Sequence, residues 1–179
     1  MKDKALELCE IFETACVFFD GAGFCLQAAD MGNPGVLSHR IPAIVNAAFA
    51  CEVFLKTLLR LFDIPLEKEH KLKQLYKRLP QDIQERIKAG AIARYGRWTD
   101  IWGQDYLDNI SNAFIKWRYH YEHDWSKSCV MHIEIGFLFA FGKSLRGECC
   151  KELYRMGWGE YRRYYGSRGG NHEKTSYAL

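Results

Sequence analysis

One dense stretch of functional side chains organises the chain: Trp117-Arg118-Tyr119-His120-Tyr121-Glu122-His123. It closes the segment from Tyr106 to Tyr121, whose large apolar residues recur at helical spacing: Ile110, Phe114, Trp117 and Tyr121. This spacing predicts a helix with a buried apolar stripe. Arg118 lies one residue beyond the stripe, so its stem can pack at the rim of a helix seam while its guanidinium reaches outward.

Arg118 and His123 lie five positions apart. Five positions along an ideal helix turn through roughly 500°, so the two side chains share a site only if the helix ends or loosens between them. The residues that follow, 124–128, include Asp124, Ser126 and Ser128 and favour a helix end there. We therefore expect His123 to lie at the end of this helix.

The rest of the chain also shows helical spacing of apolar residues, and no segment alternates in the manner of a strand. The expected helices cover residues 3–29, weakened around Gly21 and Gly23, then 42–62, 70–79, a helix from Pro80 that fades at Gly90 to Gly96, 106–121 and 130–155. These segments predict an all-α fold, an antiparallel bundle of about five helices. Residues 1–156 form the expected helical domain, and residues 157–179 the expected flexible tail, rich in Gly, Tyr and Arg.

Composition limits the classes of function. With 179 residues the chain is long enough for one domain, and its 25 basic and 22 acidic side chains leave a net charge of +3, so any nucleic-acid binding must be local. Seven cysteines with no CxxC pattern are typical of a reduced, cytoplasmic protein. Glu7, Glu10 and Glu13 argue against a signal peptide, and the apolar run 135–141 is too short to span a bilayer. We therefore expect no membrane partner.

Three motifs in the order expected for one family carry a resemblance. Residues 46–56 place an acidic side chain, Glu52, on an apolar helix, four residues before Lys56. Residues 70–76 read HKLKQLY, which is similar to an HxLxxLY/F element, and residues 118–123 have the form R-x4-H. Together these motifs, within residues 41–145, resemble the HEPN superfamily of nucleotide-binding domains.

The resemblance implies a helical bundle that dimerises so that two R-x4-H motifs face each other. It implies a metal-independent endoribonuclease without a cofactor, of the kind found among toxins and phage-defence effectors, that leaves 2′,3′-cyclic phosphate products. On this view Arg118 grips the phosphate and His123 is the general acid or base. Glu52 or Glu122 orients the guanidinium, with Lys56, His120 and Tyr121 as supporting residues.

The resemblance also limits the expected partners. They are an RNA substrate, a second copy of the chain, and a cognate antitoxin or nucleotidyltransferase. Some family members carry a tyrosine two residues after the histidine, where it receives AMP. This chain has Trp125 at that position, so the modification is not implied.

Other interpretations of the same residues stay open. A non-catalytic HEPN module that binds RNA, a nucleotide or a protein would use them without turnover. Arg118 could form a structural ion pair with Glu122 or Glu52. His123 could be a residue at the helix C-terminus that gains from the helix dipole. A zinc site from His120, His123, Cys129 and His132 has suitable spacing, but it requires two helix ends to converge without the usual glycines, so we expect no metal. In the tail, arginines alternate with tyrosines in a pattern suited to single-stranded RNA: Arg162, Arg163 and Arg168 among Tyr161, Tyr164 and Tyr165.

Overall fold

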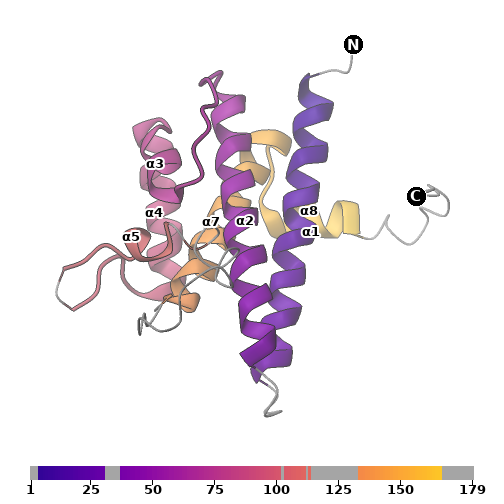
Figure 1. Ribbon diagram of the computed structural model, residues 1–179. Helices are drawn as coiled ribbons and strands as arrows, with labels where there is room; N and C mark the ends of the chain where they lie inside the picture. Colours follow the sequence, from indigo (N-terminus) through magenta and orange to yellow (C-terminus); the bar gives the residue numbers. More distant parts are fainter. Residues whose placement is uncertain (1–3, 31–36, 102, 112, 114–132, 167–179) are drawn as a thin grey trace.

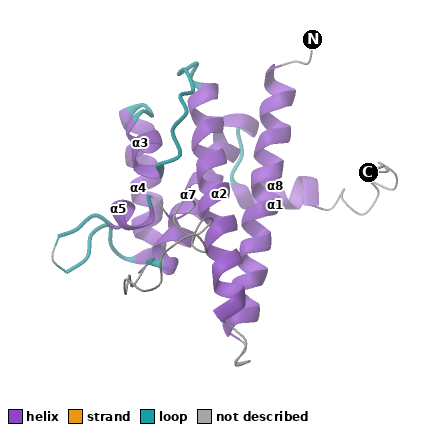
Figure 2. Cartoon of the chain, in the orientation of Figure 1, coloured by secondary structure: helices purple, strands orange, loops and turns teal. Residues whose placement is uncertain are grey.

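The computed structural model describes residues 4–30, 37–101, 103–111, 113 and 133–166 (Figure 1). The helices within these residues are α1 (Lys4–Asp30), α2 (Leu37–Leu61), α3 (Leu72–Lys77), α4 (Gln81–Tyr95), α5 (Tyr106–Ile110), α7 (Ile135–Tyr154) and α8 (Trp158–Gly166). The described part of the chain contains no strand, only an isolated bridge between Thr99 and Asp105 (Figure 2). The all-α class is confirmed. In place of about five helices, the described residues form seven, of which α1, α2, α4 and α7 are long.

Helix α2 is the centre of the bundle. It runs antiparallel to α1 along most of its length, and α7 packs against both α2 and α4 (Figure 1). The short helix α3 lies on the side of α2 that faces away from α1. Because α2 has neighbours on several sides, it buries apolar residues on more than one face, as its composition predicts.

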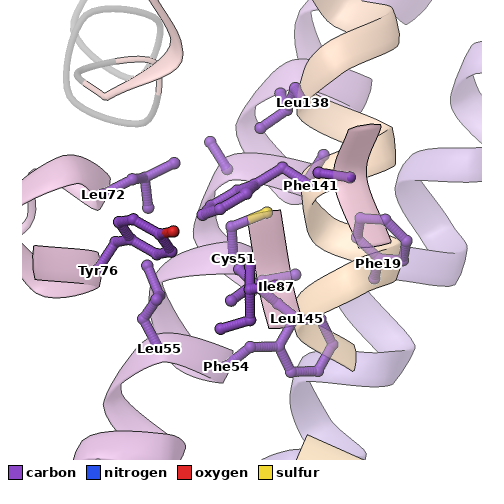
Figure 3. Packing of buried hydrophobic residues seen from close by; sticks show 14 of the residues in the cluster. Phe19, Cys51, Phe54, Leu55, Leu72, Tyr76, Ile87, Leu138, Phe141 and Leu145 are labelled. Carbon is purple, nitrogen blue, oxygen red and sulfur yellow. The ribbon is translucent and has the colours of Figure 1, made fainter. Parts of the chain in front are cut away.

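Side chains from all seven described helices meet in one apolar core, part of which Figure 3 shows. Leu72 and Tyr76 bring α3 to the same cluster that holds Phe54 of α2 and Phe141 of α7. The close approach of α7 requires a glycine, because a Cβ on Gly142 would lie 2.2 Å from Cε2 of Phe19 and 3.1 Å from Sγ of Cys51. The core therefore fixes α2, α3 and α7 relative to one another.

Several helix boundaries differ from the prediction. Helix α1 continues through Gly21 and Gly23, because its packing along α2 outweighs the low helix propensity of two glycines. Helix α2 begins before Pro42. Helix α4 continues through Gly90, where a Cβ would lie 2.3 Å from Oγ of Ser144, and it ends at Gly96 in the left-handed conformation with φ 95°. Gly90 thus permits close packing on α7 instead of ending the helix.

The expected flexible tail is wrong for residues 158–166, which form α8. Tyr161 is 8% exposed, and its hydroxyl donates to Oε1 of Glu13 at 3.0 Å. Trp158 meets Phe12 edge to face at 6.3 Å. Aromatic residues three positions apart give this Gly-rich segment one apolar face, which packs on α1. Residues 167–179, including Arg168, lie outside the described residues.

One described segment, His39–Leu61 in α2, is long and apolar enough to cross a bilayer. The prediction of no membrane partner considered residues 135–141 as a candidate span and did not consider this segment. The central helix of a packed bundle passes the same test of length and composition, and residues of α2 such as Ala48, Phe54 and Leu58 are fully buried by neighbouring helices. The segment is weak support for a membrane partner.

Candidate functional site

The structure describes part of the predicted site. Glu52 and Lys56 lie in α2, where their surroundings are defined. The remaining predicted residues, Arg118, His120, Tyr121, Glu122 and His123, lie within residues 114–132, outside the described part of the chain, as do Cys129 and His132 of the alternative zinc site. The site is therefore described from Glu52 outward.

Glu52 is a buried carboxylate that is only partly satisfied. It is 4% exposed, and its Oε1 accepts a hydrogen bond from Nζ of Lys56 at 2.7 Å. Nδ1 of His70 lies 2.9 Å from the same oxygen. The second oxygen, Oε2, is buried and has no hydrogen-bond partner among the described residues. Because an unpaired buried carboxylate oxygen is costly, this position favours a further donor.

Lys56, four residues after Glu52, forms an ion pair with it, as this spacing on a helix favours. His70 is a partner that the sequence did not assign. The sequence does mark His70 as the first residue of the HxLxxLY-like element, two residues before helix α3 begins.

Hydrogen bonds to Glu69 and the packing of α3 in the core fix the backbone around His70. Oε1 of Glu69 accepts hydrogen bonds from the backbone N–H groups of Lys71 at 2.7 Å and of His70 at 2.8 Å. These bonds lower the pKa of Glu69, and the bond from Lys71 has the largest effect. Leu72 and Tyr76 then anchor α3 in the core (Figure 3). The imidazole is 50% exposed, so one edge contacts Glu52 while the rest of the ring faces solvent.

The role of Nδ1 follows from the chemistry of its partner. Because an ionised carboxylate can only accept, Nδ1 of His70 is the donor in this contact. Such a carboxylate–imidazole pair holds a histidine in one orientation. It places an oriented imidazole beside a carboxylate oxygen with unused acceptor capacity.

Both ends of the segment that carries the R-x4-H motif are tied to this corner. At its start, the carbonyl of Ser111 accepts from the N–H of Leu72 at 3.1 Å, and its Oγ accepts from the N–H of Lys73 at 3.0 Å. At its end, the N–H of Glu134 donates to Oδ1 of Asn109 at 2.8 Å. The chain therefore leaves and returns beside α5, next to the first turn of α3 and close to His70.

No group of three or more metal-ligating side chains occurs among the residues that the structure describes. The cysteines there are unpaired, and burial raises the pKa of the Cys51 thiol and of the Cys149 thiol. These thiols therefore stay protonated and unreactive at neutral pH.

Comparisons with protein-family models, with curated proteins and with solved structures give no match for this chain. The resemblance to HEPN domains therefore rests on the residues of the three motifs.

Proposed function

We propose that this protein is a metal-independent endoribonuclease of the HEPN type, acting on flexible or single-stranded RNA. The open Oε2 of Glu52 carries the proposal, since it is a buried acceptor that requires a donor. In the proposal that donor is Arg118. Seven residues separate it from the anchored Ser111, a rise of roughly 10 Å if the segment is helical. A guanidinium suits the position because its planar fork can bind a carboxylate and a phosphate at once.

The proposed chemistry is transesterification followed by release of the cut strand. A base removes the proton from the ribose 2′-hydroxyl, and the 2′-oxygen forms a bond to the phosphorus. The bond from phosphorus to the 5′-oxygen breaks, and an acid protonates the departing oxygen. His123 is the general base or acid, and Arg118 stabilises the charge on the phosphate. Glu52, held by Lys56 and His70, positions the guanidinium.

Two copies of the chain supply the proposed site, with their R-x4-H motifs facing each other. One Arg and one His are too few groups to hold and cleave a phosphodiester, and two sets create a cationic cleft in a nearly neutral protein. Sedimentation equilibrium at micromolar concentration should give the mass of a homodimer. A strictly monomeric particle would remove the composite site.

The direct test is cleavage of single-stranded RNA in the presence of EDTA, with end-group analysis of the products. The wild-type protein should leave a 2′,3′-cyclic phosphate and a 5′-hydroxyl. His123→Ala, Arg118→Ala and Arg118→Lys should each abolish cleavage, the last because an ammonium cannot reproduce the fork. His39→Ala, a change of an exposed histidine at the other end of α2, should cut as the wild type does.

The alternative function is a non-catalytic module that binds RNA, a nucleotide or a protein partner. It predicts a folded wild-type dimer that cuts no RNA. It also predicts that Arg118→Ala lowers stability, because Glu52 would lose a structural partner. Cleavage by His123→Ala at the wild-type rate would likewise exclude the catalytic role of that histidine.

A further inference from the structure

A second feature of the molecule lies away from Glu52, between α4, α7 and α8. A cleft of ≈ 680 Å³ is lined there by five basic side chains: Arg94, Lys143, Arg146, Lys151 and Arg155. Glu160 is the one acidic residue among its lining residues. Since the whole chain carries a net charge of only +3, this is a strong local concentration of positive charge.

Arg146 is built into the wall of the cleft. It is 8% exposed, and its guanidinium lies 4.0 Å from the centre of the Trp158 ring. Nη1 donates to Oδ1 of Asp20 at 2.7 Å, while Nε is buried and has no acceptor among the described residues. A fixed guanidinium whose donors are only partly used is typical of an anion-binding position.

Two exposed lysines extend the charge along α7. Lys143, Gly147 and Lys151 are four residues apart and therefore share one helix face. Gly147 leaves that face open, since no atom lies within 4 Å of the place where its Cβ would be. Neither lysine has an acidic partner among the described residues, and the two lie eight positions apart, roughly 12 Å along the helix.

The N-terminus of α8 adds backbone donors. Its first intrahelical hydrogen bond runs from the N–H of Tyr161 to the carbonyl of Gly157 at 2.9 Å. The N–H groups of Trp158, Gly159 and Glu160 therefore have no partner within the helix, and all three residues line the cleft. A helix N-terminus attracts anions, and so does the guanidinium of the buried Arg146.

Stabilisation of helix ends does not account for all of this charge. Lys151 and Arg155 lie at the end of α7, where cations complement the helix dipole. Arg94 likewise lies in the last turn of α4, but Lys143 lies two turns before Lys151 in α7 and away from the helix end. The ring of Trp158 already packs against Arg146 and stacks on Tyr161 at 5.3 Å, so it supports the guanidinium instead of offering a surface for a base.

We propose that this cleft binds the phosphate groups of an extended phosphorylated ligand. Lysines roughly 12 Å apart are too far apart for a single phosphate, so the ligand carries several. Two sources share this chemistry, the backbone of a single-stranded RNA and a free inorganic polyphosphate. Binding here does not depend on RNA cleavage, so it can be tested apart from the proposed catalytic function.

The test measures the affinity of the full-length protein for a short, labelled 2′-O-methyl RNA, which cannot be cut through its 2′-oxygen, by fluorescence anisotropy. Tripolyphosphate is titrated separately by calorimetry. For whichever probe binds the wild type, the affinity of the double variant Lys143→Glu/Lys151→Glu should be lower by at least about ten-fold. For RNA, losing two phosphate contacts should also reduce the slope of log affinity against log salt by about 1.4.

The matched control is Lys77→Glu/Lys88→Glu, which changes the net charge equally at exposed lysines outside the cleft. Its affinity should stay close to that of the wild type. Preferential binding of RNA or of tripolyphosphate identifies the source, and either supports the site. The proposal is overturned if neither probe binds the wild type, or if both double variants bind equally well. Lys143→Gln/Lys151→Gln, measured alongside, gives the same comparison without charge reversal.

Discussion

Two buried glutamates on adjacent helices show how differently this bundle treats the same side chain. Glu148 of α7 is 8% exposed. Its Oε1 accepts a hydrogen bond from Nε of Arg86 at 2.7 Å, and Nη2 of the same guanidinium lies 2.6 Å from this oxygen. This guanidinium lies between the packed helices α4 and α7, and the bond to Glu148 is the main cause that raises the pKa of Arg86. Glu52, buried to a similar degree, has a lysine, a half-exposed histidine and one oxygen without a described partner.

The difference separates a structural ion pair from a site that is prepared for a further group. Breaking a satisfied buried pair leaves an uncompensated charge and lowers stability. A carboxylate with unused acceptor capacity already carries that penalty, so its presence favours a role other than stability. Glu148 therefore belongs to the scaffold, and Glu52 to the proposed site.

The largest expected effect on stability comes from Arg86→Met. It leaves Glu148 buried without its guanidinium and should lower the free energy of unfolding by about 3 kcal/mol. Urea denaturation of this variant and of the exposed control Lys77→Met gives the comparison. A loss below about 0.5 kcal/mol, within the range of ordinary surface substitutions, would show that Glu148 is not a scaffold residue.

Removal of residues 158–179 should lower stability by about 2 kcal/mol, because Tyr161 is buried and Trp158 packs on Phe12 and Arg146. This change affects the α7–α8 side of the bundle and leaves the contacts of Glu52 intact. RNA cleavage per folded molecule, at saturating RNA, should therefore persist. An unchanged melting temperature would mean that α8 does not contribute to the core.

Lys56→Met should have a smaller effect on stability, about 1 kcal/mol, because His70 still contacts Glu52. Thermal melting beside Lys68→Met, a change of an exposed lysine without a described contact, provides the measurement. A loss as large as that of Arg86→Met would place Glu52 in the scaffold as well.

The smallest expected effect is the slow alkylation of two thiols. Each is the sequence neighbour of one glutamate, Cys51 of Glu52 and Cys149 of Glu148. Burial raises the pKa of both, so they stay protonated as the pH rises through the range in which an exposed thiol ionises. Mass spectrometry after brief alkylation at pH 9 should find Cys9 and Cys25, which are partly exposed, modified first. Equal labelling of Cys51 and Cys25 would show that the bundle opens readily at Glu52.

Much of the fold could be predicted from helical spacing, because the long helices bury apolar residues at regular intervals. The prediction failed where tertiary contacts outweigh local propensity. Gly90 lies inside α4, since it faces Ser144 across a helix contact that no local pattern reveals. Trp158 and Tyr161 lie in a Gly-rich segment that resembles a tail until its neighbours on α1 are known.

The candidate site could be predicted only in part. Glu52 and Lys56 were found because four-residue spacing places them together on one helix. His70 is eighteen residues from Glu52 in sequence, and only the packing of α3 brings it close. The cationic cleft combines residues from α4, α7 and α8 that share no local pattern, so helical spacing does not predict it. Arg118 and His123 remain predictions from the R-x4-H motif.

The measurement that tests the central claim most directly compares Glu52→Gln with Glu148→Gln for cleavage of single-stranded RNA in EDTA. Glu52→Gln should melt within a few degrees of the wild type and cut at least about 100-fold more slowly, because Arg118 loses the carboxylate that positions it. Glu148→Gln should be less stable but should cut at the wild-type rate per folded molecule. Equal cleavage rates for the two variants, or no RNA cleavage by the wild-type protein, would contradict the account.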